Sequence, residues 1–193
     1  MKKAVIICLS ALFLCGMIGF SAADYVSAAE DGGNESIVFE MLEGASIRKE
    51  EPSGIRFTTH VTQVFIDDLQ EKNPGGTIEF GTEIVPVDIA DAEPLQIEQT
   101  KIDESSTETD IYYNAVLTKI PEEYYNFNVK ATAYYTVTSA GGEEQTVYAE
   151  NPQTRSIAYV ASGLLSLGQD EQILKDIVDK VVSSISAGED FSL

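Results

Sequence analysis

The sequence predicts an α+β fold, namely an antiparallel β-sandwich-like body with two C-terminal amphipathic helices. Two observations predict it. From residue 36 to residue 149, short segments alternate apolar and polar side chains and are separated by turn residues, which is typical of antiparallel strands in a sandwich or a strongly bent sheet. After residue 154 the apolar residues recur every three or four positions, which is typical of helices that pack by one face.

The first 23 residues are predicted to form a secretory signal peptide. Lys2 and Lys3 precede an uncharged apolar run at 4–20, and small residues follow it. One alternative is a transmembrane anchor, for which the run is shorter than the ~20 residues of a span. The other is a lipoprotein signal at Cys15, which lacks the small preceding residue that processing needs. We therefore expect a protein that is secreted or associated with the cell envelope.

The composition excludes several classes of function. The chain holds 32 acidic and 12 basic side chains, a net charge of −20, so its surface is unsuited to nucleic acids and anionic lipids. Loss of the signal peptide would leave about 170 residues with a net charge of −22 and without either cysteine, Cys8 or Cys15. A chain of that size can bury enough surface to fold without disulfides.

The first part of the mature chain is predicted to form strands and one helix. Residues 24–35 are small and polar and are expected to be a flexible tail or tether, and residues 36–193 a single β-rich domain. The strand expected at 54–62 places apolar residues on one face and Arg56, Thr58 and His60 on the other. Further strands are expected at 37–39, 45–48 and 77–87, and helical spacing at 63–72 ends in an Asn-Pro-Gly-Gly turn.

The remaining part continues with strands and ends in the two helices. Strands are expected at 95–100, 111–120, 127–138 and 146–149, separated by hydrophilic loops at 88–93 and 103–110 and by turns at Pro121 and at Gly141 and Gly142. Helices are expected at 154–167 and at 170–187, the second capped by Asp170. Neither is apolar enough to span a membrane, so both are expected to pack on the sheet or on each other.

Several short motifs resemble a known group of domains. In chain order they are GASIR at 44–48, SGIRF at 53–57, FGT at 80–82, NAVLT at 114–118, RSIAYVA at 155–161 and LKDIV at 174–178. Together they resemble a β-rich extracellular domain found in secreted and surface proteins of Firmicutes, Gram-positive bacteria that include gut clostridia. The resemblance covers residues 40–190 and implies a surface location. It implies neither an established activity nor particular site residues.

The mature chain offers few groups for catalysis. His60 is its one histidine, so a Ser–His–Asp arrangement would have to use it, and no Gly-x-Ser-x-Gly turn presents a nucleophile. We expect His60 to be a solvated strand residue. A zinc site lacks nitrogen and sulfur ligands, and no phosphate-binding loop is present.

Carboxylates remain as a chemical resource. Two of them about 5–10 Å apart in a cleft could hydrolyse a glycosidic bond. Calcium is the cofactor that oxygen ligands would suit, with Asp88, Asp91 and Glu93 as weak candidates, although their loop matches no defined calcium loop.

Three arginines, Arg48, Arg56 and Arg155, stand out because each follows or precedes apolar residues within one of the resembling motifs. Strand parity places Arg48, Arg56 and His60 on one side of their strands. If these strands pair with the strand that carries Glu79 and Glu83, a cross-strand ionic cluster would follow, which Arg155 could join from the start of its helix. We expect such a structural ion network, because a guanidinium fork suits carboxylates in fixed geometry. The alternative is an arginine-lined site for an acidic ligand, such as a peptide terminus or a uronic acid.

The chain has nine tyrosines and no tryptophan, so tyrosine rings are the main candidates for a stacking surface. Six of the tyrosines form adjacent pairs at 112–113, 124–125 and 134–135. Neighbouring side chains of a strand point to opposite faces, so one ring of each strand pair must face outward, and we assign Tyr112 and Tyr134 to that face. Tyr124 and Tyr125 lie at a turn. These four could form a surface for a sugar or a partner protein.

By elimination, the sequence favours a non-catalytic interaction module that binds an extracellular glycan or protein. The alternatives are a carboxylate-dependent glycan hydrolase and a structural subunit that associates with copies of itself through its helices. The oligomeric state does not follow from the sequence.

Overall fold

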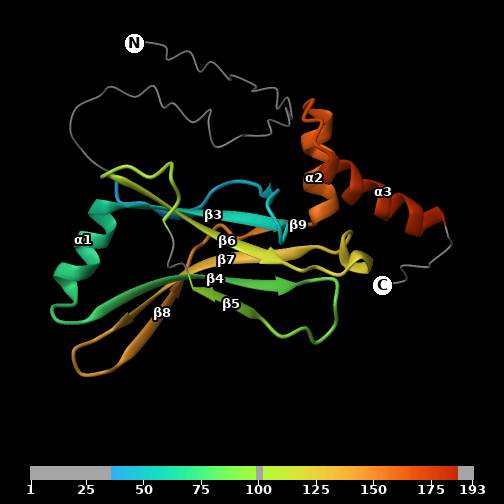
Figure 1. Ribbon diagram of the computed structural model, residues 1–193. Coiled ribbons are helices and arrows are strands. Elements are labelled where there is room, and N and C mark those ends of the chain that lie inside the picture. Colours follow the sequence, from blue (N-terminus) through green and yellow to red (C-terminus); the bar gives the residue numbers. More distant parts are fainter. Residues whose placement is uncertain (1–35, 99–101, 187–193) are drawn as a thin grey trace, which may run out of the picture.

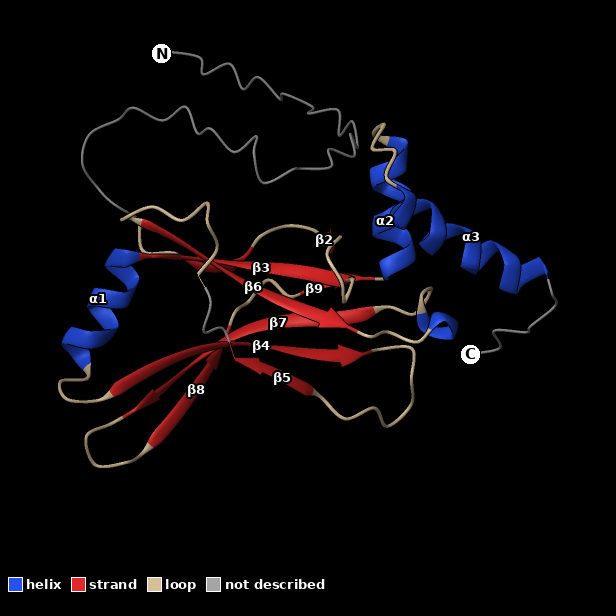
Figure 2. Ribbon diagram, viewed as in Figure 1, coloured by secondary structure: helices blue, strands red, loops and turns tan. Residues whose placement is uncertain are grey.

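The computed structural model describes residues 36–98 and 102–186, which form two facing antiparallel sheets with helix α1 at one end and helices α2 and α3 at the other (Figures 1 and 2). The predicted fold class is confirmed. The predicted signal peptide and tail lie outside the described residues. The elements are β1 (Phe39–Met41), β2 (Ser46–Arg48), β3 (Gly54–Thr62), α1 (Gln63–Lys72), β4 (Thr77–Pro86), β5 (Leu95–Glu98), β6 (Asp110–Thr118), the 3₁₀ turn η1 (Glu122–Tyr124), β7 (Val129–Thr138), β8 (Glu144–Tyr148), β9 (Gln153–Arg155), α2 (Ile157–Ser166) and α3 (Gln172–Ser186).

Each sheet is built around one long antiparallel pair. In sheet A, β3 pairs along its whole length with β6, and its other edge pairs with β2 and β1 one after the other. In sheet B, β4 pairs with β7, β5 covers the free edge of β4, and β8 and β9 share the free edge of β7. Strands β3 and β4 therefore belong to different sheets, although only α1 separates them in the sequence.

The period of two in the strands determines which side chains face the core. The inward positions of β3, β4 and β7 hold Ile55, Phe57, Ile84 and Ala131, all of them at most 1% exposed. Burying each of the three large side chains contributes about 1.5–3 kcal/mol. At the α1 end the core is aromatic, because Phe39 stacks on Phe65 with ring centres 5.5 Å apart.

Helix α1 begins and ends where the sequence predicts. Leu69 is its buried residue, and the amide of Asn73 donates to Leu69 O at 2.8 Å, which satisfies one of the last carbonyl groups. Gly75 then adopts φ +77°, a left-handed conformation that side chains disfavour. The helix packs beside β3 and the start of β4 and carries the chain from one sheet to the other.

The start of the first C-terminal helix differs from the prediction. Thr154 and Arg155 are in β9 and pair with Lys130 and Val129, so the helix expected from residue 154 begins at Ile157. Ser156 is its N-cap and accepts a hydrogen bond from Tyr159 N at 3.2 Å. Three residues are too few to show alternation, and the apolar spacing of the helix hid this strand.

The second helix also begins later than predicted. It starts at Gln172, so Glu171 rather than Asp170 precedes it, and Asp170 instead pairs with Lys175 at 2.5 Å. The inward stripe of α3 includes Leu174 and Ile177, which are at most 2% exposed and pack with α2 in the main core. None of the helices in the described part of the chain has both the length and the apolar character needed to cross a bilayer.

Candidate functional site

His60 lies on the outer face of sheet A, as predicted, but it is not a solvated residue. Its side chain is 15% exposed and stacks on Tyr112 of β6 with ring centres 4.8 Å apart. Its Nε2 lies 2.8 Å from Asp110 Oδ1, and its Nδ1 lies 4.0 Å from Glu40 Oε1. The prediction was wrong because cross-strand partners on β1 and β6 cover a position that strand parity alone places outside.

The contacts of His60 join strands rather than activate a nucleophile. The hydroxyl of Thr109 and the His60 ring hold the pKa of the Asp110 carboxyl below its ordinary value. In the described ranges, both nitrogens of the ring face carboxylates, and no serine or threonine hydroxyl is hydrogen-bonded to it. Tyr112 stacks on the His60 ring, so it belongs to these contacts between strands and one of its ring faces is covered.

The predicted ionic cluster of the arginines does not form. Arg56 belongs to sheet A, whereas Glu79 and Glu83 belong to sheet B, because β3 pairs with β6 and β4 pairs with β7. Arg155 is in sheet B as well, where its Nη1 donates to Thr154 O at 2.7 Å and its guanidinium lies 5.9 Å from the Tyr159 ring centre. The premise that these strands pair was wrong, since α1 carries the chain across the sandwich.

Arg48 and Arg56 do lie on one surface, the outer face of sheet A. Ser46 is opposite Arg56 and Arg48 is opposite Gly54, which makes the two arginines diagonal neighbours about 7–8 Å apart at Cα. Among the described residues, the ion-pair partner of Arg48 is the exposed Glu50, at the long distance of 3.9 Å. Within the described ranges the guanidinium of Arg56 makes no hydrogen bond or ion pair, and its Nε is buried without a partner.

A chain of polar side chains continues from Arg56 along this face. Thr58 donates to Asn114 Oδ1 at 2.8 Å, and the Asn114 amide donates to Asp103. Burial alone would raise the pKa of Asp103, but the hydroxyl and N–H of Ser105, the Asn114 amide and the charge of Arg56 together hold it below its ordinary value. We call Arg48, Arg56, Thr58, Asn114 and Asp103 the arginine face.

The outer face of sheet B carries an aromatic pair, Tyr134 and the exposed Tyr148. The ring of Tyr134 on β7 lies across Gly81 on β4, so close that a Cβ at Gly81 would come within 2.2 Å of Tyr134 Cζ. Tyr148 on β8 is opposite Tyr134, with ring centres 5.8 Å apart and planes inclined by 53°. The absent side chain at Gly81 is what allows the phenol ring to lie against the strand.

Glutamates and one glutamine surround this aromatic pair. Glu83 accepts from the Gln96 amide at 2.8 Å and from the Tyr148 hydroxyl at 3.4 Å. Burial raises the pKa of Tyr134, and the charges of Glu98, Glu79 and Glu83 raise it further, because they surround the phenol hydroxyl. We call Tyr134, Tyr148, Gly81, Gln96 and the three glutamates the tyrosine–glutamate face.

The structure separates the four tyrosines that the sequence selected. Tyr112 stacks on His60 in sheet A and Tyr134 lies on sheet B. Tyr124 and Tyr125 lie at η1, where Tyr124 packs on Phe127 and Tyr125 contacts the core and Lys180. The sequence reasoning missed Tyr148, although the Gly141–Gly142 turn, which brings β8 back along β7, was the signal that could have placed it opposite Tyr134.

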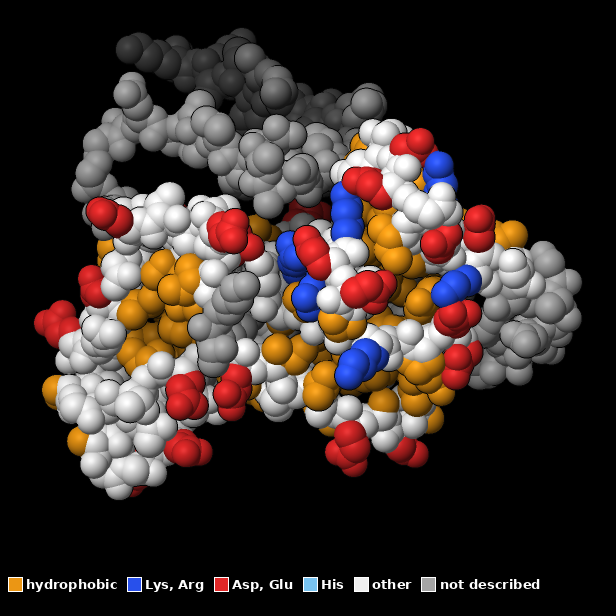
Figure 3. Space-filling view, in the orientation of Figure 1, with side chains coloured by type: hydrophobic (Ala, Val, Ile, Leu, Met, Phe, Trp, Pro, Cys, Tyr) orange, Lys and Arg blue, Asp and Glu red, His pale blue; other side chains and the backbone are white. Residues whose placement is uncertain are grey.

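A cavity of about 740 Å³ opens beside the tyrosine–glutamate face, between α1, the start of β4 and the end of β5. Ile66, Phe80 and Tyr113 supply apolar walls, and Glu79 and Glu98 supply two carboxylates. Figure 3 shows hydrophobic side chains gathered beside the α1 end of the molecule. The strand register places Glu98 opposite Gly81. Glu98 is therefore the diagonal neighbour of Glu79, and the two Cα atoms are about 7–8 Å apart.

The candidate calcium ligands are not gathered around one point. Asp88 Oδ2 accepts from the backbone N–H of Asn128 at 2.6 Å and from its side-chain amide at 3.1 Å, which ties the end of β4 to the start of β7. Asp91 occupies a turn with φ +55°, and Glu93 is exposed. Over residues 36–98 and 102–186, no group of three or more acidic or histidine side chains is arranged to hold a metal ion.

Comparison of the chain with protein-family models, curated proteins and solved structures finds no significant match. The resemblance to clostridial surface domains therefore stays a prediction.

Proposed function

We propose that the protein is an exported, non-catalytic interaction module that binds an extracellular glycan on its tyrosine–glutamate face. The observation that carries the proposal is the ring of Tyr134 lying across Gly81, where no side chain separates it from the strand. A pyranose ring presents a flat face of C–H groups, and the exposed face of a phenol ring matches it in size and polarity. The face is carried by paired strands, so the groups are held in place before a ligand arrives.

The polar groups around Tyr134 define the class of glycan. Glu83 and Glu98 can accept hydrogen bonds from sugar hydroxyls, and the Gln96 carbonyl can do so too. Three carboxylates on one face would repel a uronate or a sulfated sugar, since like charges on a surface oppose one another. The proposal is therefore a neutral or amine-bearing glycan.

The binding test is a screen of the purified protein against immobilised neutral, amine-bearing and acidic glycans. Selective retention on neutral or amine-bearing glycans is the expected result. If the purified protein binds none of these glycans but is retained by an immobilised surface protein, the ligand would be a protein rather than a glycan. Export is tested separately by following the full-length chain in cell fractions, where the expected product lacks residues 1–23.

A second candidate function, glycan hydrolysis, rests on Glu79 and Glu98, which both line the cavity beside this face. Carboxyl groups about 5–10 Å apart are the spacing that glycosidic hydrolysis uses. Any glycan retained in the screen should therefore be incubated with the protein and assayed for new reducing ends. Hydrolysis that is lost in both Glu79→Gln and Glu98→Gln would make the protein an enzyme and overturn the non-catalytic proposal.

A further inference from the structure

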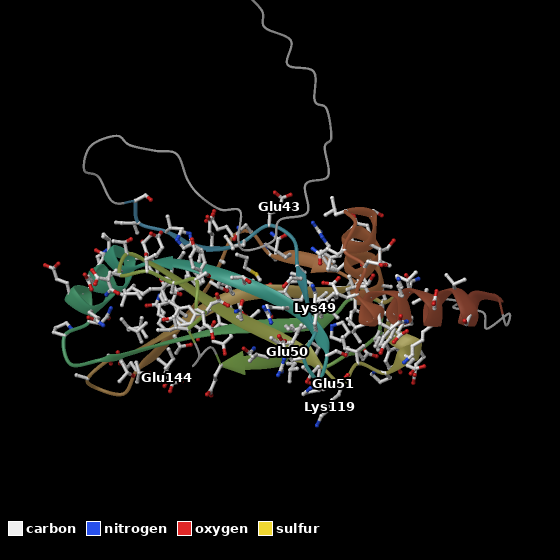
Figure 4. All side chains as sticks on the ribbon, turned by 45° about the horizontal axis from the view of Figure 1, so that its top comes forward. Glu43, Lys49, Glu50, Glu51, Lys119 and Glu144 are labelled. Atoms are coloured by element: carbon white, nitrogen blue, oxygen red, sulfur yellow. The ribbon has the colours of Figure 1, made fainter. Side chains whose placement is uncertain are left out.

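The arginine face and the loops beside it bring four basic side chains together in a chain that has only 12. Arg48 and Arg56 are diagonal neighbours on β2 and β3, and Lys49 and Lys119 follow the ends of β2 and β6 at the same end of sheet A. Figure 3 shows Lys and Arg side chains beside α2, with acidic side chains among them, whereas the charged side chains visible at the α1 end are acidic. Figure 4 places Lys49 and Lys119 at this end, together with Glu50 and Glu51.

The acidic residues nearby do not neutralise both arginines. Glu171 is paired with Lys49 at 2.5 Å, and Glu50 is 74% exposed and 3.9 Å from Arg48, a distance and exposure at which an ion pair contributes about 0–1 kcal/mol. Asp103 attracts Arg56 electrostatically but is itself engaged by Ser105 and Asn114. The two guanidinium groups therefore keep most of their donors for a ligand.

We propose that the arginine face binds the carboxylate of an acidic sugar residue, a uronate, through Arg48 and Arg56. Two arginines whose Cα atoms are about 7–8 Å apart on one sheet face can bring their guanidinium groups to one carboxylate from both sides. The Nε atom of Arg56 is buried, so protein atoms surround that part of its side chain. Arginine suits this role better than lysine, because its planar fork matches the two oxygens of a carboxylate.

The residues next to the arginines favour a sugar over an acidic peptide. A uronate unit carries one carboxylate and several hydroxyls. The Asn114 amide has a second hydrogen beyond the one given to Asp103, the Thr58 hydroxyl can still accept, and Asp103 can accept from a sugar hydroxyl. The side chains of an acidic peptide offer carboxylates without hydroxyls, so they would leave these hydrogen-bonding groups unused.

This site differs from the proposed glycan site in place and in charge. The arginine face is on sheet A and the tyrosine–glutamate face is on sheet B, and the core lies between them. A variant of one face should therefore leave binding at the other face unchanged, so failure of either proposal is visible independently of the other.

The test is calorimetric titration of the purified protein with a trigalacturonate, with its methyl ester and with an oligoglutamate of equal charge. We expect the free acid to bind at least about tenfold more tightly than the ester, because the ester removes the charged hydrogen bonds. Arg48→Gln and Arg56→Gln should each weaken binding of the acid by about fivefold or more. Arg155→Gln removes the same charge from sheet B and should change the affinity less than about twofold.

Four outcomes would overturn the proposal. They are no binding of the acid, equal binding of acid and ester, an equal loss in Arg155→Gln, and tighter binding of the oligoglutamate, which would make the ligand a peptide. If Arg56→Gln does not fold, Arg56→Lys keeps the charge without the fork. Arg56→Lys should still weaken binding of the free acid. Unchanged affinity for the acid in both Arg56→Lys and Arg48→Gln would contradict the proposed role of the two arginines in binding the carboxylate.

Discussion

Asn151 acts as a strand partner for Met41. Its side-chain amide donates to Met41 O at 2.8 Å, and its Oδ1 accepts from Met41 N at 3.0 Å. Met41 ends β1 in sheet A, and Asn151 lies between β8 and β9 of sheet B, so one side chain joins the edges of the two sheets. Gln153 adds a second link by accepting from Gly44 N at 2.9 Å.

The Asn151→Ala variant should lower the free energy of unfolding by about 1–3 kcal/mol, because it leaves the N–H and C=O of a buried residue without partners. Met41 is 2% exposed, so water cannot easily replace them. Urea unfolding measures the effect. Gln172→Ala is the control, since it removes one exposed side-chain hydrogen bond within α3 and should cost only about 0.2–0.5 kcal/mol. Equal losses in the two variants would contradict the linking role.

The Gly81→Ala variant should abolish most glycan binding while keeping the tyrosine. The new Cβ would meet Tyr134 Cζ at 2.2 Å, and the flexible ring must swing away from the strand. We expect affinity for a retained glycan to fall at least about tenfold, while stability changes by less than about 1 kcal/mol. Calorimetric titration and thermal unfolding measure the two effects.

Gly163→Ala is the matched control for this variant. Apart from the neighbouring backbone of α2 itself, no described atom lies within 4 Å of a Cβ there, so the variant should gain about 0.5–1 kcal/mol and bind normally. Unchanged glycan affinity in Gly81→Ala would remove Tyr134 from the site.

The Ser156→Ala variant should lower stability by about 1 kcal/mol, because Ser156 is the N-cap of α2 and its hydroxyl satisfies Tyr159 N. Ser166 is the control within the same helix, since its hydroxyl donates to Ser162 O from an exposed position. Its replacement by alanine should cost less than about 0.5 kcal/mol. A smaller effect at Ser156 than at Ser166 would contradict the cap.

Acid should destabilise the protein through Asp103 and Asp110. The folded-state pKa of each is lowered, so each carboxylate stabilises the fold above its unfolded pKa, ordinarily about 3.9. That stabilisation is lost as the pH falls through the lower folded-state values. We expect Asp103→Asn and Asp110→Asn to be less stable at pH 7 and to lose less stability between pH 5 and pH 2. Unfolding followed by circular dichroism across this range measures the slope, and Glu123→Gln gives the effect of net charge alone.

The sequence could predict the elements far better than their partners. The faces of β3 and β4 and the bounds of α1 follow from hydrophobic period, which depends on neighbouring residues alone. Which strands pair is decided by contacts between distant residues. Arg56 was therefore placed on the correct face of β3 but beside the wrong glutamates.

The tyrosine–glutamate face shows the same limit. Strand parity placed Tyr134 outside, but the site also needs Gly81 directly opposite and Tyr148 on the other side. Both neighbours depend on register, which the hairpin turn at 139–143 sets for β8 and which long-range packing sets for β4. His60 was misjudged for a related reason, since the residues that cover it come from β1 and β6.

The two outer faces of the sandwich point away from each other, separated by a core about 10 Å thick. A polymer lying on one face would leave the other accessible, so occupancy of the two faces would be independent. A single copy holding a neutral or amine-bearing chain on sheet B and an acidic chain on sheet A would then be a cross-linker. In mixtures of the two polymers its effect would be greatest at intermediate protein concentration, because excess protein would occupy each chain separately.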